Sequence, residues 1–255
     1  GGRPAALRAT ALFATSSISS GSRQGGALPQ EIELTEREAR TIRLGASWST
    51  AEGAGVRGSW EHRNLFGAAE KITLGLSIAQ IEQSATADFR KPHFLRPDQS
   101  LLASAEIAHE ESDAYKEDRA RAGVSLERVL TERWTGSLGV TFQLTETTDS
   151  NGRIGYQLFG IPATVKYDST DDVLDPSKGI RATLNGTPYF GASDEEPTTF
   201  TKLEASGSTY LGLSEELTLA LRGRYGLIAA GDTEDVPGST RFYAGGGGSV
   251  RGYGY

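Results

Sequence analysis

Apolar and polar residues alternate one by one along most of the chain after residue 30. In KITLGLSIA, residues 71–79, every second side chain is a leucine or an isoleucine, and the positions between them are mostly polar or glycine. The stretches at 136–146 and 217–227 repeat this pattern. Because successive side chains of a β-strand point to opposite faces, each stretch predicts a strand with one apolar and one polar face.

The predicted strands are long. Strands of globular proteins commonly have about five or six residues, whereas a tilted strand that crosses a bilayer needs about 9–11. No helical period of comparable length separates the segments. Eleven segments follow the pattern, near 41–50, 54–63, 70–82, 85–91, 100–110, 117–128, 132–146, 154–169, 179–191, 199–212 and 216–230.

The junctions between these segments carry turn-forming residues. Examples are DSNG at 149–152 and DPSKG at 175–179, in which Asp, Asn, Ser, Pro and Gly favour turns for separate conformational reasons. Pro162 instead falls inside the segment 154–169. Since proline cannot donate a ladder hydrogen bond, it predicts a bulge or a local break there.

The polar face of each segment is made of small or charged residues, which suit a water-filled lumen better than a packed core. The predicted fold class is all-β, an antiparallel transmembrane β-barrel. A soluble β-sandwich or a lipocalin-like barrel also has one apolar face per strand and stays as the alternative. A sandwich needs a core of large apolar side chains from both sheets, so the strand length and the small second face favour the membrane barrel.

Composition narrows the function classes. The chain has 255 residues, no cysteine and a net charge of −7. The absence of cysteine excludes a disulfide framework, thiol catalysis and cysteine-ligated metals. The acidic balance argues against nucleic acid as a partner. No apolar run reaches the roughly 18 residues of a membrane-spanning helix. The absence of methionine indicates that the natural start of the polypeptide is missing.

Residues 1–30 differ from the rest of the chain. They are rich in Ala, Ser and Gly, and they contain Arg3, Arg8 and Arg23 but no acid. We interpret them as a low-complexity, disordered remnant or linker. An organellar transit-like segment, which is also rich in Arg and Ser and poor in acids, is the alternative.

Candidate catalytic or metal-binding residues are few. His62, His93 and His109 have no spacing typical of metal ligands. The acids between Asp168 and Asp175 lack the calcium-loop pattern and its terminal Glu. No serine, histidine and acid arrangement resembles a hydrolase triad. The sequence therefore gives no catalytic residues, and it predicts no metal.

The most specific motif lies at the end, in RFYAGGGGSVRGYGY, residues 241–255. Gly245 to Gly248 cannot form a phosphate loop, because neither a Gly-Lys-Ser/Thr sequence nor a helical pattern follows. Val250, Arg251, Gly252 and Tyr253 come after Ser249. The guanidinium of an arginine in such a setting can pair with acids inside a polar lumen.

This ending resembles the lid-loop motif of the BamA/TamA superfamily of outer-membrane barrel assembly proteins. Its sequence pattern, FYAGGxxSVRGYxY, resembles the TamA branch more than the BamA branch. Residues 42–74 are similar to the family's entry into its first three strands, and 165–184 resemble its turn with Asp-Pro-x-x-Gly. The residues that carry the resemblance are, in the lid loop, Gly245, Gly246, Val250, Arg251, Gly252 and Tyr253 and, in two periplasmic turns, Asn64, Gly67, Asp175, Pro176 and Gly179.

The resemblance implies a sixteen-stranded barrel in which the lid loop follows strand eleven, on the extracellular side. On that expectation the chain is a fragment that lacks five strands. Residues 31–40 would end a periplasmic POTRA-like domain, and 41–255 would be the N-terminal part of the barrel, ending in the lid loop. The first strand would form a lateral seam with the last, and Ile42, Leu44, Gly45 and Trp48 lie in it.

The function implied is a non-enzymatic insertion and assembly factor in the bacterial outer membrane, with autotransporter-type clients. Its partners would be the outer-membrane lipid bilayer, unfolded outer-membrane protein clients and an inner-membrane-anchored partner protein of the TamB type. The resemblance implies no nucleotide, metal or other cofactor. A passive pore or adhesin on the same barrel, and a protein-secretion transporter of the same superfamily, remain as alternatives.

Overall fold

The computed structural model describes residues 13–20, 30–49, 53–112, 115–150, 152–194, 196–214, 216–232 and 235–243. Within these ranges the regular elements are strands, apart from a short 3-10 helix, η2 (Gly238–Thr240). Their bounds are β1 (Phe13–Ser20), β2 (Gln30–Glu36), β3 (Arg40–Ser49), β4 (Gly53–Arg63), β5 (Lys71–Ala79), β6 (Glu82–Lys91), β7 (Gln99–Glu111), β8 (Lys116–Val129), β9 (Trp134–Asp149), β10 (Gly152–Gly160), β11 (Ala163–Asp168), β12 (Gly179–Ser193), β13 (Glu196–Gly212) and β14 (Thr218–Ala229).

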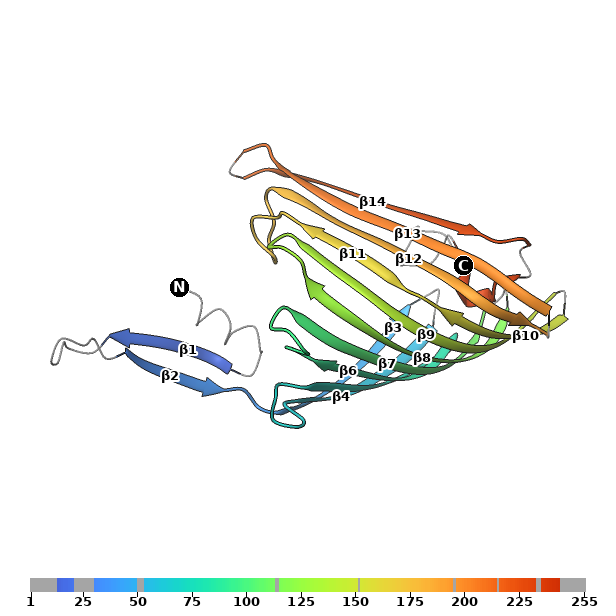
Figure 1. The fold of residues 1–255 in the computed structure, drawn as a ribbon, viewed down its shortest axis with the longest axis horizontal. Helices are drawn as coiled ribbons and strands as arrows, with labels where there is room; N and C mark the ends of the chain where they lie inside the picture. The colour runs from blue at the N-terminus through green and yellow to red at the C-terminus, as the bar shows by residue number, and fades with distance from the viewer. Residues whose placement is uncertain are drawn as a thin grey trace.

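Strands β3 to β14 form one curved antiparallel sheet in which neighbours in sequence are neighbours in space. The sheet has the shape of an open trough, and β3 and β14 are its two edges (Figure 1). It contains twelve strands in the described part of the chain. Two of them, β10 and β11, lie end to end between β9 and β12 and so occupy one strand position. Each of the eleven predicted segments corresponds to one strand position in the sheet. The predicted fold class is therefore confirmed.

The predicted break at Pro162 is also confirmed. β10 and β11 both pair with β9 and with β12, in continuous register on each side. Pro162 lies in the gap between them, where its carbonyl still accepts a hydrogen bond from the Gly139 N–H at 2.9 Å. Because Pro162 has no N–H to donate, the strand is interrupted there but keeps its direction.

The two faces of the sheet have opposite chemistry. Large apolar side chains alternate on the outer face, and examples such as Leu76, Val140 and Leu221 are exposed to the surroundings. The inner face carries Thr, Ser, Gly and ion-paired residues, in the register that the strand pairing sets. An apolar exterior and a polar interior with a period of two match a barrel wall that faces lipid outside and water inside.

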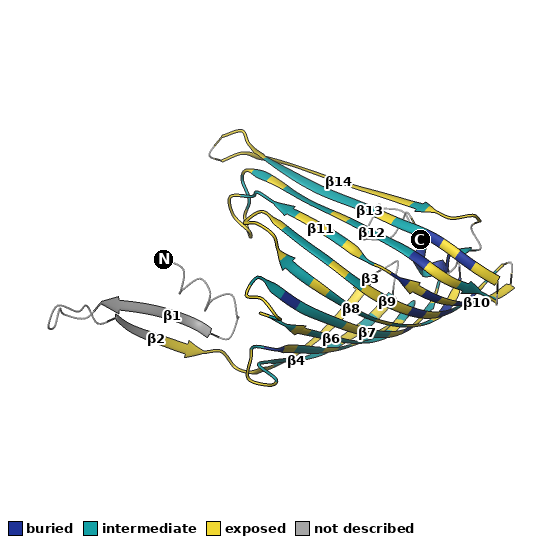
Figure 2. Cartoon of the chain, in the orientation of Figure 1, coloured by how far each residue is buried: buried dark blue, intermediate teal, exposed yellow. Residues whose placement is uncertain are grey.

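The sheet has two ends. The one that carries the turns at 64–70 and 169–178 is called the turn end, and the one at which β14 finishes is called the return end. Residues 235–243 fold back from β14 over the inner face at the return end, where most of the fully buried residues gather (Figure 2). The antiparallel order places both predicted turns on one end and the start of the lid-loop region on the other.

Two strands, β1 and β2, precede the large sheet. Phe13–Ser20 is strand β1, and it pairs antiparallel with β2 from Phe13 opposite Glu36 to Ser20 opposite Gln30. The two strands form a separate two-stranded sheet. The linker after β2 is attached to the sheet, since Arg63 donates to the carbonyls of Ala39 (2.7 Å) and Glu38 (3.0 Å).

In the described residues no helix is long and apolar enough to cross a membrane.

Candidate functional site

β3, the expected seam strand, is an edge of the sheet. Among the described residues it pairs only with β4, from Arg40 opposite His62 to Ser49 opposite Gly53. Ile42, Leu44 and Trp48 point to the outer face and are 72%, 85% and 76% exposed. Gly45 lies between them on the inner face, and a Cβ there would meet no atom within 4 Å. The other edge of β3 has no partner strand among the described residues, and the same holds for the outer edge of β14.

A buried acid on β4 ties β3 to its neighbours. The Glu61 side chain is almost fully buried, and its carboxylate lies 2.9 Å from Lys71 Nζ of β5 and 3.5 Å from Arg43 Nη1 of β3. It also pairs with Arg63 of its own strand. Sequence reasoning missed Glu61, because alternation assigns a face to a residue but does not reveal its partners across strands.

The predicted turn at Asn64–Gly67 is a tight loop closed by its own side chains. The N–H groups of Asn64 and Leu65 donate to the carbonyl of Glu70 at 2.6 and 2.9 Å. The Asn64 side-chain oxygen accepts from the Ala69 N–H at 2.9 Å. Gly67 has φ +93°, a conformation that glycine adopts without strain.

Glu70 fixes the exit of this turn. Its side chain is 1% exposed, and it accepts from the Ala68 N–H at 2.9 Å and pairs with Lys91 Nζ at 3.1 Å. Burial disfavours the charged form of Glu70, but the Ala68 N–H and Lys91 together hold the pKa of this carboxyl below its ordinary value. The turn between β4 and β5 is thus joined to β6 by a charge-assisted contact.

The second predicted turn, around Asp175, Pro176 and Gly179, is organised by two acids that precede the motif. Asp171 accepts from the N–H groups of Ser177 (2.9 Å) and Lys178 (3.0 Å). Asp172 accepts from the N–H groups of Leu174 (2.7 Å) and Asp175 (2.9 Å). The Ser177 hydroxyl and the Lys178 N–H hold the pKa of Asp171 well below its ordinary value.

Gly179 is required sterically at the end of that turn. Its φ is +110°, and a Cβ would lie 2.4 Å from the carbonyl oxygen of Ser169. The motif glycine therefore combines a left-handed backbone with a close backbone approach. The same turn presents Leu174, which is 93% exposed, at its tip.

The inner face near the return end carries a network of charges. Arg119 on β8 contacts Glu106 of β7 at 2.8 Å and Glu117 of its own strand at 3.0 Å. Farther along β8, Arg121 donates to the buried Gln143 side chain of β9 at 2.9 and 3.1 Å. Such pairs neutralise charges that face the interior of the trough.

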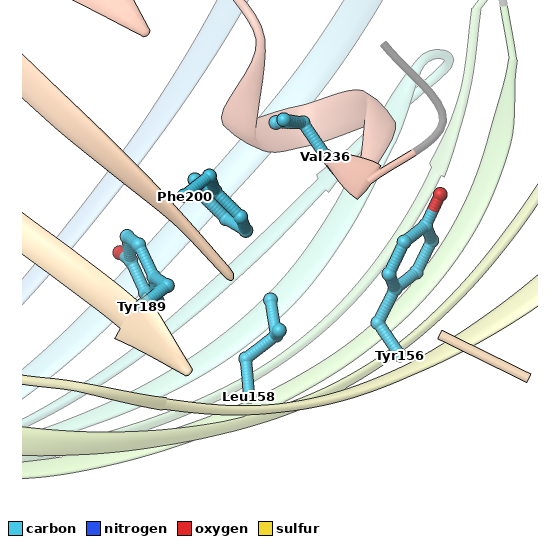
Figure 3. Close-up of a cluster of buried hydrophobic side chains, with 5 residues drawn as sticks. All are labelled: Tyr156, Leu158, Tyr189, Phe200 and Val236. Atoms are coloured by element: carbon cyan, nitrogen blue, oxygen red, sulfur yellow. The ribbon is translucent and has the colours of Figure 1, made fainter. Parts of the chain in front are cut away.

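Residues 235–243 lie on this inner face and lead toward the predicted lid loop. Val236 packs on a cluster formed by Tyr156, Leu158, Tyr189 and Phe200 (Figure 3). The backbone N–H of Ser239 donates to Glu117 Oε2 at 3.0 Å. Sequence reasoning missed this segment, which has no alternation and is identified only by its contacts in the fold.

Tyr115, in the loop before β8, borders this segment. Its hydroxyl donates to Glu110 at 2.7 Å, and its ring lies 5.6 Å from that of Tyr243, centroid to centroid. Burial and the neighbouring Glu110 carboxylate raise the pKa of Tyr115, so the hydroxyl stays a neutral hydrogen-bond donor.

The predicted lid-loop residues Gly245, Gly246, Val250, Arg251, Gly252 and Tyr253 lie outside the described residues. In the part of the chain that is described, no group of three or more His, Cys, Asp or Glu side chains could hold a metal ion. His93 instead contacts the carbonyl of Pro97 at 2.9 Å, and His109 contacts Asp118 at 2.8 Å.

A meander of long antiparallel strands, apolar outside and ion-paired inside, defines a transmembrane β-barrel protein of the outer membrane. The chain belongs to the Omp85 superfamily, since the model of the Omp85 superfamily domain matches residues 64–255. This membership confirms the superfamily that the motifs indicated.

Two relatives are both named outer membrane protein assembly factor BamA. The one from Nitratidesulfovibrio vulgaris is 28% identical over 238 residues, which cover 88% of this chain. The one from Neisseria meningitidis serogroup B is 26% identical over an alignment of 255 residues, gaps included, and 87% of this chain is covered. The chain spans 29% and 31% of the length of these relatives.

Solved structures agree on the fold. BamA from Haemophilus ducreyi lacking POTRA domains 1–3 superimposes with a TM-score of 0.77 at 18% identity, covering 98% of this chain and 53% of that one. CdiB from Acinetobacter baumannii gives a TM-score of 0.55 at 13% identity, with 95% and 48% covered.

Proposed function

We propose that this chain forms the barrel portion of a non-enzymatic factor that inserts and assembles outer-membrane proteins. The observation that carries the proposal is the match of the Omp85 superfamily domain to residues 64–255, in a sheet whose first strand is β3. The names of the two BamA relatives support it, because both describe assembly of outer-membrane proteins. The partners of the complete protein are then the lipid bilayer and unfolded outer-membrane protein clients.

The proposed mechanism is strand addition at a lateral seam. An incoming client strand pairs with the free edge of β3, and the backbone hydrogen bonds that it forms repay the cost of leaving water. The strands on this side of the sheet are short, with 10 residues in β3, 9 in β5 and 10 in β6, whereas β9 has 16 and β13 has 17. Short strands beside the seam favour a locally thinner bilayer, which lowers the barrier to insertion.

The proposed role of the Val250–Tyr253 motif is that of a lid. Arg251 would pair with acids of the lumen wall and hold the glycine-rich loop inside the barrel. The position of the motif in the sequence supports this, since only six residues separate it from residues 235–243, which lie on the inner face.

Clients of the autotransporter type, and a partner protein of the TamB type anchored in the inner membrane, belong to the TamA branch. The sequence motif FYAGGxxSVRGYxY favours that branch, whereas the two relatives named above are BamA proteins. We keep TamA-like clients and partner as the more specific form of the proposal.

Reconstitution of the complete protein into lipid vesicles tests the function. We expect an unfolded outer-membrane protein to insert and fold several times faster in these vesicles than in empty ones. Steady ion conductance without faster insertion would instead support a passive pore. Transfer of a soluble client across the membrane would support a secretion transporter.

A further inference from the structure

The inner face of the sheet carries one apolar patch amid polar residues. Tyr156 and Leu158 of β10, Tyr189 of β12 and Phe200 of β13 are all buried, and the rings of Tyr189 and Phe200 stack with centroids 4.8 Å apart. Apolar side chains facing a watery lumen are unfavourable unless something covers them. The cover is Val236, which is 3% exposed (Figure 3).

Polar contacts fix the same segment on either side of Val236. The Thr198 hydroxyl donates to the Asp235 carbonyl at 3.3 Å, and the Ser239 N–H donates to Glu117 at 3.0 Å. Glu117 is itself held in place, because it accepts from the Thr147 hydroxyl at 2.9 Å and pairs with Arg119 at 3.0 Å. The acceptor is therefore also held by side chains of the sheet itself.

The C-terminal end of the segment, at Phe242, also packs against the sheet. The Phe242 ring lies under Lys202 Nζ, 4.7 Å from the ring centroid, in an arrangement that favours a cation–π contact. A Cβ on Gly226 of β14 would lie 2.5 Å from this ring. Gly226 therefore leaves the space that Phe242 occupies.

We propose that Asp235–Tyr243 is a latch, and that Glu117 is the residue that positions it on the lumen wall. The latch covers the apolar patch through Val236. It narrows the lumen at the return end. Its link to the lid rests on the proposed function, but its docking is a property of the described residues and is tested separately.

Cysteine labelling measures the docking. The chain contains no cysteine, and the Ser239 hydroxyl is buried without a hydrogen-bond partner among the described residues, so Ser239→Cys is a near-isosteric probe. It is placed in the complete protein, in vesicles, and treated with a membrane-impermeant maleimide. Because a lost hydrogen bond to a carboxylate weakens docking, Glu117→Ala should speed labelling about tenfold or more.

The matched control is Glu127→Ala. Glu127 is an acid of the same strand and face, and it pairs with Arg90 (2.8 Å) and Lys166 (3.2 Å) near the turn end. Labelling should stay slow in this variant. Glu117→Gln keeps an oxygen that can accept the Ser239 N–H but loses the charge beside Arg119. It should label more slowly than Glu117→Ala if Glu117 acts by positioning the segment.

A second variant alters only the latch. Val236→Asp places a charge against the apolar patch, so it should expose the probe and raise the ion conductance of the barrel in planar bilayers. Slow labelling in both Glu117→Ala and Val236→Asp would overturn the latch. Equal labelling of Glu117→Gln and Glu117→Ala would overturn the positioning role. Neither readout depends on client insertion, so failure of the assembly function would be seen separately.

Discussion

Arg43 of β3 and Glu61 of β4 meet across the first strand pair of the sheet, with Nη1 and Oε2 3.5 Å apart. The same carboxylate oxygen lies 2.9 Å from Lys71 of β5. One buried acid therefore connects the edge strand, its partner and the next strand. We infer that this contact limits how easily the edge strand separates from the sheet when a client approaches.

Glu61→Ala should loosen β3. The substitution leaves Arg43, Arg63 and Lys71 close together without their acid, so the barrel should lose about 1.5–3 kcal/mol, the range for hydrogen bonds to charged groups. Urea unfolding in lipid vesicles measures this loss, and amide hydrogen exchange locates it in β3. Glu204→Ala is the control, because the contact of Glu204 with Lys202 is long, at 3.9 Å, and the Glu204 side chain is 42% exposed. A pair of this kind contributes little to stability. Equal losses in the two variants would contradict the role of Glu61.

Gly179→Ala should disrupt the turn before β12. The new Cβ would lie 2.4 Å from the Ser169 carbonyl oxygen, in a backbone with φ +110°. Gly67→Ala gives the matched comparison, since its φ is +93° but a Cβ there meets nothing within 4 Å. We expect about 1 kcal/mol of conformational cost at Gly67 and a distinctly larger loss at Gly179. Thermal unfolding monitored by gel mobility distinguishes them, and similar losses would show that the backbone approach is unimportant.

Asp171 should make the 169–178 turn sensitive to acid. Its pKa is lowered in the folded protein, chiefly by the Ser177 hydroxyl and the Lys178 N–H. Its contribution to stability is therefore complete above the ordinary aspartate value of about 3.9 and is lost as the pH falls below it toward the folded pKa. Asp171→Asn should increase protease cleavage of the turn at pH 7.

The control for this prediction is Asp175→Asn. The N–H groups of the turn bond to Asp171 and Asp172, and Asp175 contributes its own N–H to Asp172. Cleavage at pH 7 should change little in this variant. A larger effect at Asp175 than at Asp171 would show that the motif acid, and not the preceding pair, holds the turn.

Arg251→Ala should release the proposed lid. If the guanidinium holds the loop in the lumen, the complete protein should become more sensitive to external protease in this loop and insert clients more slowly. Arg241→Ala serves as a comparison, because Arg241 donates to the Val236 carbonyl at 2.9 Å and thus acts on the segment before the loop. Unchanged protease protection and client insertion in Arg251→Ala would contradict the lid.

The alternation of side chains was sufficient to predict the sheet. It predicted all eleven strand positions and the apolar and polar face of each, because side chains of a strand alternate between its two faces. Pro162 predicted the gap between β10 and β11 for an equally local reason, its missing N–H. The strand β1 was not predicted, because FATSSISS has no regular alternation and takes its order from β2.

The contacts of the candidate site depend on register and on distant segments. Glu61 reaches Arg43 only because Ile42 pairs with Trp60, and a shift by one residue would turn Glu61 to the other face. Ser239 reaches Glu117 across 122 residues. No local pattern encodes such a distance, so the latch becomes visible only in the fold.

Cross-linking at the edge strand tests the central claim most directly. Ser47→Cys on β3 and Ser125→Cys on β8 place the same small residue on the inner face of an edge strand and of an interior strand. In vesicles that hold the complete protein, a client stalled during insertion and carrying single cysteines along its strands is exposed to an oxidant. We predict disulfides between the client and position 47, with few or none at position 125. Insertion that proceeds without cross-links at position 47, or with equal cross-links at both positions, would contradict assembly at this seam.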